Sequence, residues 1–108
     1  LHVSATGKVL LAFSPKDLQE RIIYNNIPQE IDKNRLKEEL EEIKEQGFAY
    51  SKEEWIPHAG DISVPLFDSR GLFVAQLGLA GLAASFDGQE EVIVKKLKEA
   101  AARIKEQL

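Results

Sequence analysis

Several features that define common protein classes are missing from this sequence. None of the 108 residues is cysteine, so the chain can form neither disulfides nor a thiolate metal site. No apolar run approaches the roughly 20 residues that a membrane-spanning helix needs. The opening residues also lack the charged and apolar pattern of a signal peptide. These absences favour a soluble protein that does not enter membranes, and they fit a reducing cytoplasm.

Positive charge is also scarce relative to negative charge. Fourteen Lys and Arg residues stand against 18 Asp and Glu residues, which gives a formal net charge of −4. Proteins that grip a nucleic-acid backbone need clustered Lys and Arg, so this chain is a poor DNA-binding unit by itself. With 44% hydrophobic and 30% charged residues, it has the composition of one folded domain.

The spacing of apolar and capping residues predicts three helices in the first half of the chain and one at its end. Pro15 suits the first position of the second helix, and Gly47 suits the end of the third. The last helix begins with a possible capping box. The four expected N-caps are Ser4, Ser14, Asp32 and Asp87.

The apolar period changes from helical to alternating after Gly47. Three strands are expected, at residues 48–51, 62–67 and 72–80, with a turn between the last two. Pro65 cannot donate to a strand ladder, so it should face an edge or a bulge. The resulting order, three helices, three strands and one helix, predicts a single α+β domain.

A catalytic or metal site has few components in this chain. His58 lies near Glu53, Glu54 and Asp61, so a metal cluster or an acid–base pair can be drawn. However, no second histidine lies close by, and no serine has the context of a nucleophile elbow. We therefore expect no enzyme activity, no cofactor and no bound metal.

Small residues at two places are compatible with a ligand site. Ala5 and Thr6 open a helix, where unpaired N–H groups and the helix dipole attract anions. Gly78 and Ala80 lie on one face of a strand, where small side chains leave room. Close packing of a helix against the sheet explains the same two residues equally well.

The chain also resembles a known family at several points in the same order. The opening segment 1–13 (LHVSATGKVLLAF) resembles the start of the effector-binding domain of IclR-family bacterial transcriptional regulators. The stretch from Gly47 to Asp68 is similar to the characteristic stretch of that family. Residues 74–81 (VAQLGLAG) and 100–104 (AAARI) resemble the strand and the closing helix that follow.

This resemblance implies a GAF-like α+β fold with a ligand pocket on one face of an antiparallel sheet. It implies that residues 1–108 are a partial effector-binding domain, without the winged helix-turn-helix domain and the first part of the effector domain. The parent regulator would bind DNA, assemble as a dimer or tetramer and respond to a small organic acid or a sugar-acid-like effector in the cytoplasm.

The same resemblance implies which residues contact the effector. Ala5 and Thr6 would hold an effector carboxylate through their N–H groups, and Ser51, Gly78 and Ala80 would line the pocket. Asp61 departs from the family, which prefers Cys, Ser or Ala there. If it faces the pocket, its unpaired carboxylate would favour a bipolar effector, with an anionic end at Ala5 and Thr6 and a donor-rich end at Asp61.

Alternatives remain open at this stage. Asp61 could instead bind a cation together with His58, or turn to solvent. The whole chain could be a structural oligomerisation module whose pocket has no function, or an enzyme of related fold. Whether Gly78 and Ala80 border a cavity or a packed helix separates a sensor from a structural module, and an exposed His58 argues against an enzyme.

Overall fold

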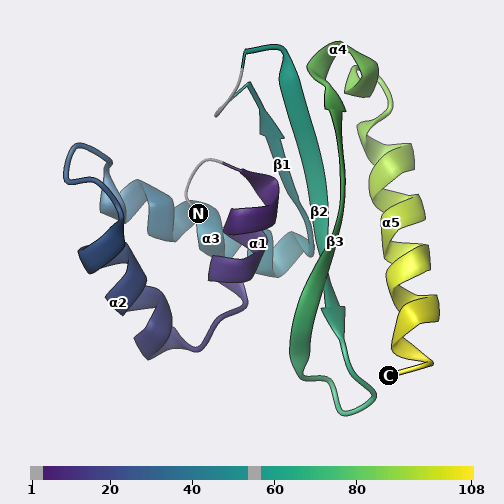
Figure 1. The fold of residues 1–108 in the computed structure, drawn as a ribbon, viewed down its shortest axis with the longest axis horizontal. Helices are drawn as coiled ribbons and strands as arrows, with labels where there is room; N and C mark the ends of the chain where they lie inside the picture. Colours follow the sequence, from purple (N-terminus) through teal and green to yellow (C-terminus); the bar gives the residue numbers. More distant parts are fainter. Residues whose placement is uncertain (1–3, 54–56) are drawn as a thin grey trace.

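The computed structural model describes residues 4–53 and 57–108 and shows an α+β fold (Figure 1). This confirms the expected fold class, with one helix added between the last strand and the final helix. The elements, in chain order, are α1 (Ala5–Ala12), α2 (Lys16–Asn26), α3 (Lys33–Gln46), β1 (Ala49–Lys52), β2 (Ala59–Phe67), β3 (Phe73–Leu82), α4 (Ala83–Phe86) and α5 (Glu90–Lys105).

The three strands form one antiparallel sheet in the order β1-β2-β3. The register places Asp61 of β2 opposite Ser51 on one side and Ala80 on the other. Pro65 lies beyond Ser63, the last residue of β2 that pairs with β1, so its missing N–H removes no bond to that strand. The central strand β2 contacts both other strands and the helices α1, α4 and α5.

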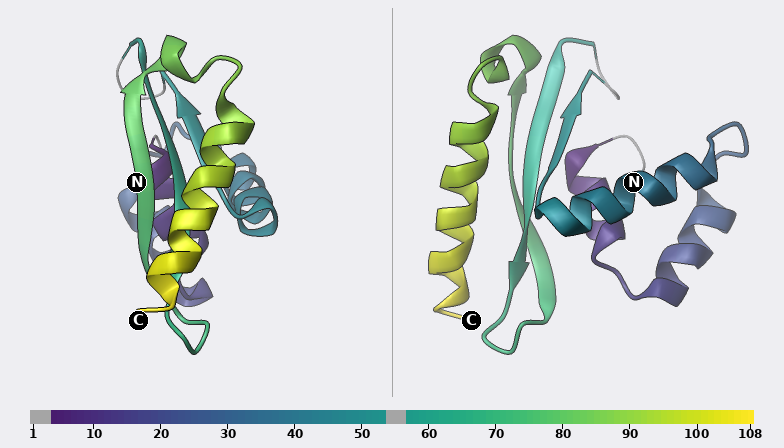
Figure 2. Two further views of the ribbon diagram at one scale, coloured as in Figure 1. Left: turned by 90° about the vertical axis from the view of Figure 1, so that its right-hand side faces the viewer. Right: turned by 180° about the vertical axis from the view of Figure 1, so that it is seen from behind.

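Helices cover both faces of the sheet (Figure 2). On one face α5 lies along the strands, where Ile62 of β2 packs with Phe86 and Val94. On the other face α1 lies between the sheet and α3, and its apolar residues join those of α2 and α3. Helix α1 is therefore a buried helix, which explains why its residues are apolar around most of its circumference.

The helix ends test the capping predictions directly. Ser4 caps α1, Asp32 caps α3 by accepting N–H bonds from Asn34 and Arg35, and Gly47 closes α3 in the left-handed conformation, all as expected. The Ser14 cap is wrong, because its hydroxyl donates to the Leu10 carbonyl and α2 begins after Pro15 without a side-chain cap.

The predicted cap of the last helix is also wrong. Asp87 ends the short α4, and its carboxylate accepts a bond from Lys52 Nζ at 3.2 Å. Helix α5 begins after Gln89 and has no side-chain cap. A lysine from a strand 35 residues away thus competes successfully for the carboxylate that local sequence assigned to the helix.

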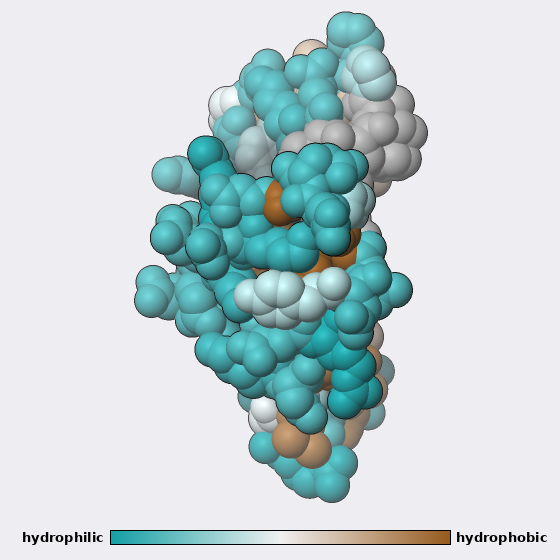
Figure 3. Space-filling view, turned by 90° about the vertical axis from the view of Figure 1, so that its left-hand side faces the viewer, coloured by the Kyte–Doolittle hydropathy of each residue, from teal (hydrophilic) through white to brown (hydrophobic). Residues whose placement is uncertain are grey.

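The outer surface of α2 and α3 is hydrophilic, as the space-filling view from that side shows (Figure 3). Exposed Glu and Lys residues lie on the outer side of α3, while Leu36, Leu40 and Ile43 point to the core. This is the solvated face of an amphipathic helix. Among the described residues, no helix is both long and apolar enough to cross a membrane.

Gly47 tests the left-handed end of α3. Its φ of +80° is unfavourable for a residue with a Cβ, although a Cβ there would contact only the flexible end of Lys98. We expect Gly47→Ala to lower the free energy of unfolding by about 1–2 kcal/mol. Gly81→Ala is the control, because a Cβ at that position has no neighbour within 4 Å. Equal stability losses in urea titrations of the two variants would contradict this account.

Asp68 organises the turn between β2 and β3. Its Oδ1 accepts the N–H groups of Arg70 and Leu72 at 2.8 and 3.0 Å, and Oδ2 accepts a bond from the Arg70 guanidinium. The Leu72 N–H is the main reason that the pKa of Asp68 is lowered from its ordinary value of 3.8, and Arg70 lowers it further. The folded state therefore favours the ionised carboxylate.

This lowered pKa predicts a dependence of stability on pH. A carboxylate whose pKa is depressed by folding stabilises the protein above its unfolded pKa, and this contribution disappears as the pH falls through the folded value. The stability difference between wild type and Asp68→Asn should therefore shrink below about pH 3.8. Denaturant titrations across that range measure it, with exposed Glu42→Gln as control. A difference independent of pH would be the contrary result.

Candidate functional site

The face of the sheet that looks toward α1 carries small and polar side chains. Cross-strand pairing and the two-residue repeat place on this face Ala49 and Ser51 of β1, Asp61 and Ser63 of β2, and Gln76, Gly78 and Ala80 of β3. The opposite face carries Ile62, Val64 and Leu66 in the same central strand. The apolar face binds α5, whereas the polar face meets the start of α1.

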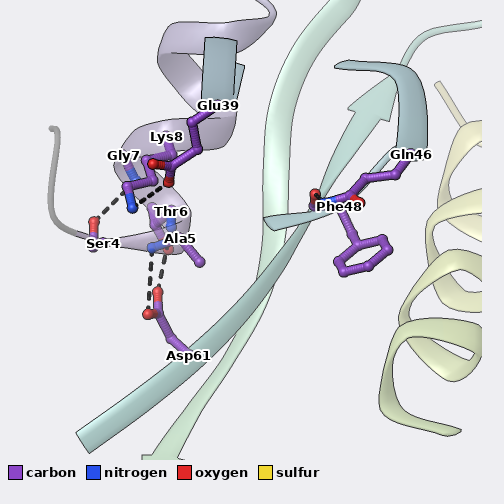
Figure 4. Close-up of polar contacts among 9 residues, drawn as sticks. All are labelled: Ser4, Ala5, Thr6, Gly7, Lys8, Glu39, Gln46, Phe48 and Asp61. Atoms are coloured by element: carbon purple, nitrogen blue, oxygen red, sulfur yellow. Dashed lines mark hydrogen bonds and ion pairs between the residues drawn. The ribbon is translucent and has the colours of Figure 1, made fainter. Parts of the chain in front are cut away.

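The first turn of α1 has all three of its N–H groups satisfied by side chains (Figure 4). The Ser4 hydroxyl accepts the Gly7 N–H at 3.0 Å. Asp61 takes the other two: Oδ1 accepts the Ala5 N–H and Oδ2 accepts the Thr6 N–H, each at 3.3 Å. These are the N–H groups that a helix cannot satisfy internally. A strand residue thus completes the cap of a helix more than 50 residues away.

Asp61 lies almost wholly inside the protein, with 5% of its surface exposed. A buried carboxylate is costly unless it is paired, and here two backbone donors and the positive end of the α1 dipole compensate it. The expectation of an unpaired Asp61 carboxylate is therefore wrong. The donors that were expected to bind an effector carboxylate already bind a carboxylate of the chain itself.

Gly78 and Ala80 lie beside this interaction at the surface of β3. Both residues are exposed, so no helix among the described residues covers them. A Cβ at Gly78 would lie 3.2 Å from Gln76 Oε1 and 3.6 Å from Thr6 Oγ1. Glycine at this position therefore lets Gln76 and the Ile62 carbonyl lie close to the strand, where a side chain would be tight against both.

Two polar residues on this face were missed by the sequence analysis. The Ser63 hydroxyl donates to Gln76 Oε1 at 2.7 Å, next to Gly78. Gln76 stands two residues before Gly78, and Ser63 two after Asp61, so the strand period alone would have placed both on the same face. Together with the Thr6 hydroxyl they add uncharged donors and acceptors to the candidate site.

Ser51 lies on the same face of the sheet as Asp61, and its expected place in an effector pocket stays a prediction. It is fully buried, opposite Asp61 in the β1–β2 ladder. It therefore lies beside Asp61 in the buried part of this face.

On α1, the nearly buried Lys8 forms an ion pair with Glu39 of α3, which joins the helix to the layer outside it (Figure 4).

Whereas Asp61 is buried, His58 lies at the surface. Its side chain is 88% exposed, its ring Nδ1 lies 3.6 Å from Glu53 Oε1, and its N–H donates to the same oxygen. Glu54, the other acidic neighbour considered, lies outside the described residues. In the described part of the chain no group of three His, Asp or Glu residues is arranged to hold a metal. The exposed histidine argues against the acid–base pair.

The hollows found on the described surface lie away from the candidate site. One of about 640 Å³ lies between Phe48 and α5. Another, of about 390 Å³, lies near the turn that contains His58, and neither is lined by Ala5, Thr6 or Asp61. The candidate site is thus defined by its polar groups and its small residues, not by a deep cavity.

Comparison with known families shows which protein family has this arrangement of elements. The profile of the bacterial transcriptional regulator IclR C-terminal domain matches residues 1–106. The chain belongs to this family. Its combination of a short buried helix, three antiparallel strands and a long covering helix is the fold that IclR-family structures share with it. The family is one of transcriptional regulators, which confirms the resemblance noted in the sequence.

Solved structures show the same relationship. The IclR protein of Thermotoga maritima is 32% identical, with a TM-score of 0.85 over 99% of this chain and 46% of its own. The C-terminal domain of Escherichia coli KdgR is 28% identical, with a TM-score of 0.81 over 98% of this chain and 69% of its own. No curated protein matches the sequence.

A third structure shares the fold at lower identity. It is a double mutant of the inducer-binding domain of the Acinetobacter transcription factor PobR, in complex with 3-hydroxybenzoic acid, and it is 22% identical with a TM-score of 0.84. The alignment covers 99% of this chain and 66% of that one. The chain thus spans less than half of the Thermotoga regulator and about two thirds of the isolated domains.

The Asp61 cap predicts a measurable stability contribution. Asp61→Ala leaves two N–H groups of α1 without their acceptor, so the free energy of unfolding should fall by about 1–3 kcal/mol. The matched control is Asp87→Ala, since that side chain is 58% exposed and its ion pair with Lys52 lies at the surface. Its loss should stay below about 1 kcal/mol. A denaturation experiment in which both variants lose the same amount would refute the cap.

Proposed function

We propose that the chain is the sensing part of a DNA-binding transcriptional regulator in the cytoplasm. A small organic acid or sugar-acid-like effector binds to it without being chemically changed. The DNA-binding winged helix and the remainder of the effector domain belong to other parts of that regulator. The span of the chain relative to the Thermotoga regulator supports this division.

One observation carries the proposal: a polar, uncovered surface lies beside a buried helix start in a domain of this family. Gly78 and Ala80 are exposed on β3, and Thr6, Ser63 and Gln76 bring hydroxyl and amide groups to the same part of the surface. Ligand sites commonly combine such convergent polar groups with a preformed scaffold. The complex of the PobR domain with 3-hydroxybenzoic acid supports the effector class, since that relative has the same fold.

Binding would be reported through the packing of α1. This helix contacts all three strands and α3, so a ligand between its start and β3 acts on several layers together. A ligand shifts a conformational equilibrium only when it binds one state better than the other. We propose that this preference changes the assembly or the orientation of the DNA-binding domains.

A structural oligomerisation module is the alternative function, and the exposed apolar residues of β3 favour it. Val74, Leu79 and Leu82 are each about half exposed or more. Such residues on an edge strand are suited to association with another chain. In the proposed sensor they would serve the dimer or tetramer of the regulator, alongside the effector site.

A larger side chain at Ala80, which pairs with Asp61 across the strands, tests the proposed sensing function. Val suits a strand, so Ala80→Val should fold while its methyl groups occupy the candidate site. Calorimetry with a panel of sugar acids, amino acids and hydroxybenzoates should identify an effector for the wild type, and the variant should bind it about 10- to 100-fold more weakly. Gly81→Val is the control, because position 81 faces the other way and has free space.

The same experiment separates the two functions. An oligomeric wild-type chain that binds no member of the panel would support the structural module. An effector that binds wild type and both variants equally would place the site elsewhere in the molecule. Effector-dependent DNA binding by the regulator that contains the chain would link the site to transcription.

A further inference from the structure

We infer that Asp61 is a built-in anion that determines which ligands this site accepts. Its carboxylate occupies the Ala5 and Thr6 N–H groups, so the effector presents an uncharged polar group to the start of α1. Any carboxylate that the effector carries lies elsewhere. This inference rests on the proposed sensing function for its meaning, but its chemistry can be tested separately.

The geometry leaves no free donor for a second anion in the first turn of α1. The Ala5 and Thr6 N–H groups each contact a different oxygen of Asp61 at 3.3 Å, and Gly7 donates to Ser4. A helix start stabilises roughly half a unit of negative charge, and one buried carboxylate already supplies more than that. A ligand carboxylate would have to displace Asp61 or lie beside it.

Both routes are unfavourable. Displacement leaves the Asp61 charge buried without its donors, because only 5% of the residue is exposed. Binding beside it brings two like charges together where little water screens them. The start of α1 therefore discriminates against a carboxylate by repulsion, which is an effective way to reject a ligand or an unwanted binding orientation.

The groups around Asp61 instead suit hydroxyl, carbonyl or amide functions. Ser63, two residues after Asp61 in β2, forms an uncharged hydrogen-bonded pair with Gln76 of β3. The Thr6 hydroxyl lies 3.6 Å from the position that a Cβ of Gly78 would occupy. Carboxylate oxygens retain further acceptor capacity after one hydrogen bond each. A ligand hydroxyl could therefore donate to Asp61 without disturbing the α1 cap.

The test uses acetate, a small carboxylate, as its probe. The readout is the shift of the Ala5 and Thr6 backbone amide signals in NMR titrations of the whole chain. In wild type, acetate should leave these signals unchanged. In Asp61→Ser, which removes the charge and opens the space, acetate should shift them and bind at least about tenfold more tightly than in wild type.

Two further variants control for charge, volume and stability. Asp61→Asn keeps the volume but not the charge, so it should gain less acetate affinity than Asp61→Ser. Asp68→Ser removes another buried aspartate that accepts two backbone N–H groups, in the β2–β3 turn, and should gain none.

Specific outcomes would overturn the inference. One is an acetate-induced shift of the Ala5 and Thr6 signals in wild type, which requires no variant to fold. Another is a folded Asp61→Ser protein that binds acetate no better than wild type. A failed search for an effector would contradict the proposed function alone, because the acetate result does not depend on the natural ligand.

Discussion

The contact between Asp61 and the first turn of α1 is the interaction on which the arrangement of this domain depends. It joins the central strand to a buried helix that touches the whole sheet and α3. The apolar core holds these layers together through non-directional burial, which specifies no particular position along the helix axis. A carboxylate bonded to two N–H groups does specify that position, because its geometry is directional.

The two faces of the sheet differ in the residues that they carry around this contact. On the α5 side, Ile62 and Val64 are fully buried and serve stability. On the α1 side, the residues around Asp61 are small and polar, whereas apolar contact with the sheet lies at the other end of α1, where Phe13 packs against Phe67 and Phe73. Two polar contacts fix α1 on this side: Asp61 of β2 accepts bonds from its first turn, and Lys8 pairs with Glu39 of α3. Sites of binding commonly depart from the packing rules of the core in this way.

Local sequence signals predicted most of the fold. Apolar periodicity identified the helices and strands, and Ser4, Asp32 and Gly47 marked helix ends where the structure has them. Ser14 and Asp87 failed because other partners, the Leu10 carbonyl and Lys52, compete for their side chains. Family resemblance supplied the candidate residues of the site, which stay a prediction, and Gln76 could have been added from the strand period.

The partners of Asp61 could not be predicted in the same way. They lie 55 and 56 residues away, and only the packing of α1 on the sheet brings them together. The sequence showed that an acidic residue stood at an unusual position, and burial arguments then suggested an unpaired charge. Its pairing with the very donors assigned to the effector is a tertiary effect, and it changes the chemistry expected of the site.

Amide hydrogen exchange of Ala5 and Thr6 tests this central claim most directly. First-turn N–H groups have no acceptor within their own helix, so they exchange rapidly unless another group binds them. We predict that both amides are protected in wild type and that Asp61→Ser removes their protection while the amides of β2 and α5 remain protected. Rapid exchange of Ala5 and Thr6 in the wild-type chain would contradict the account.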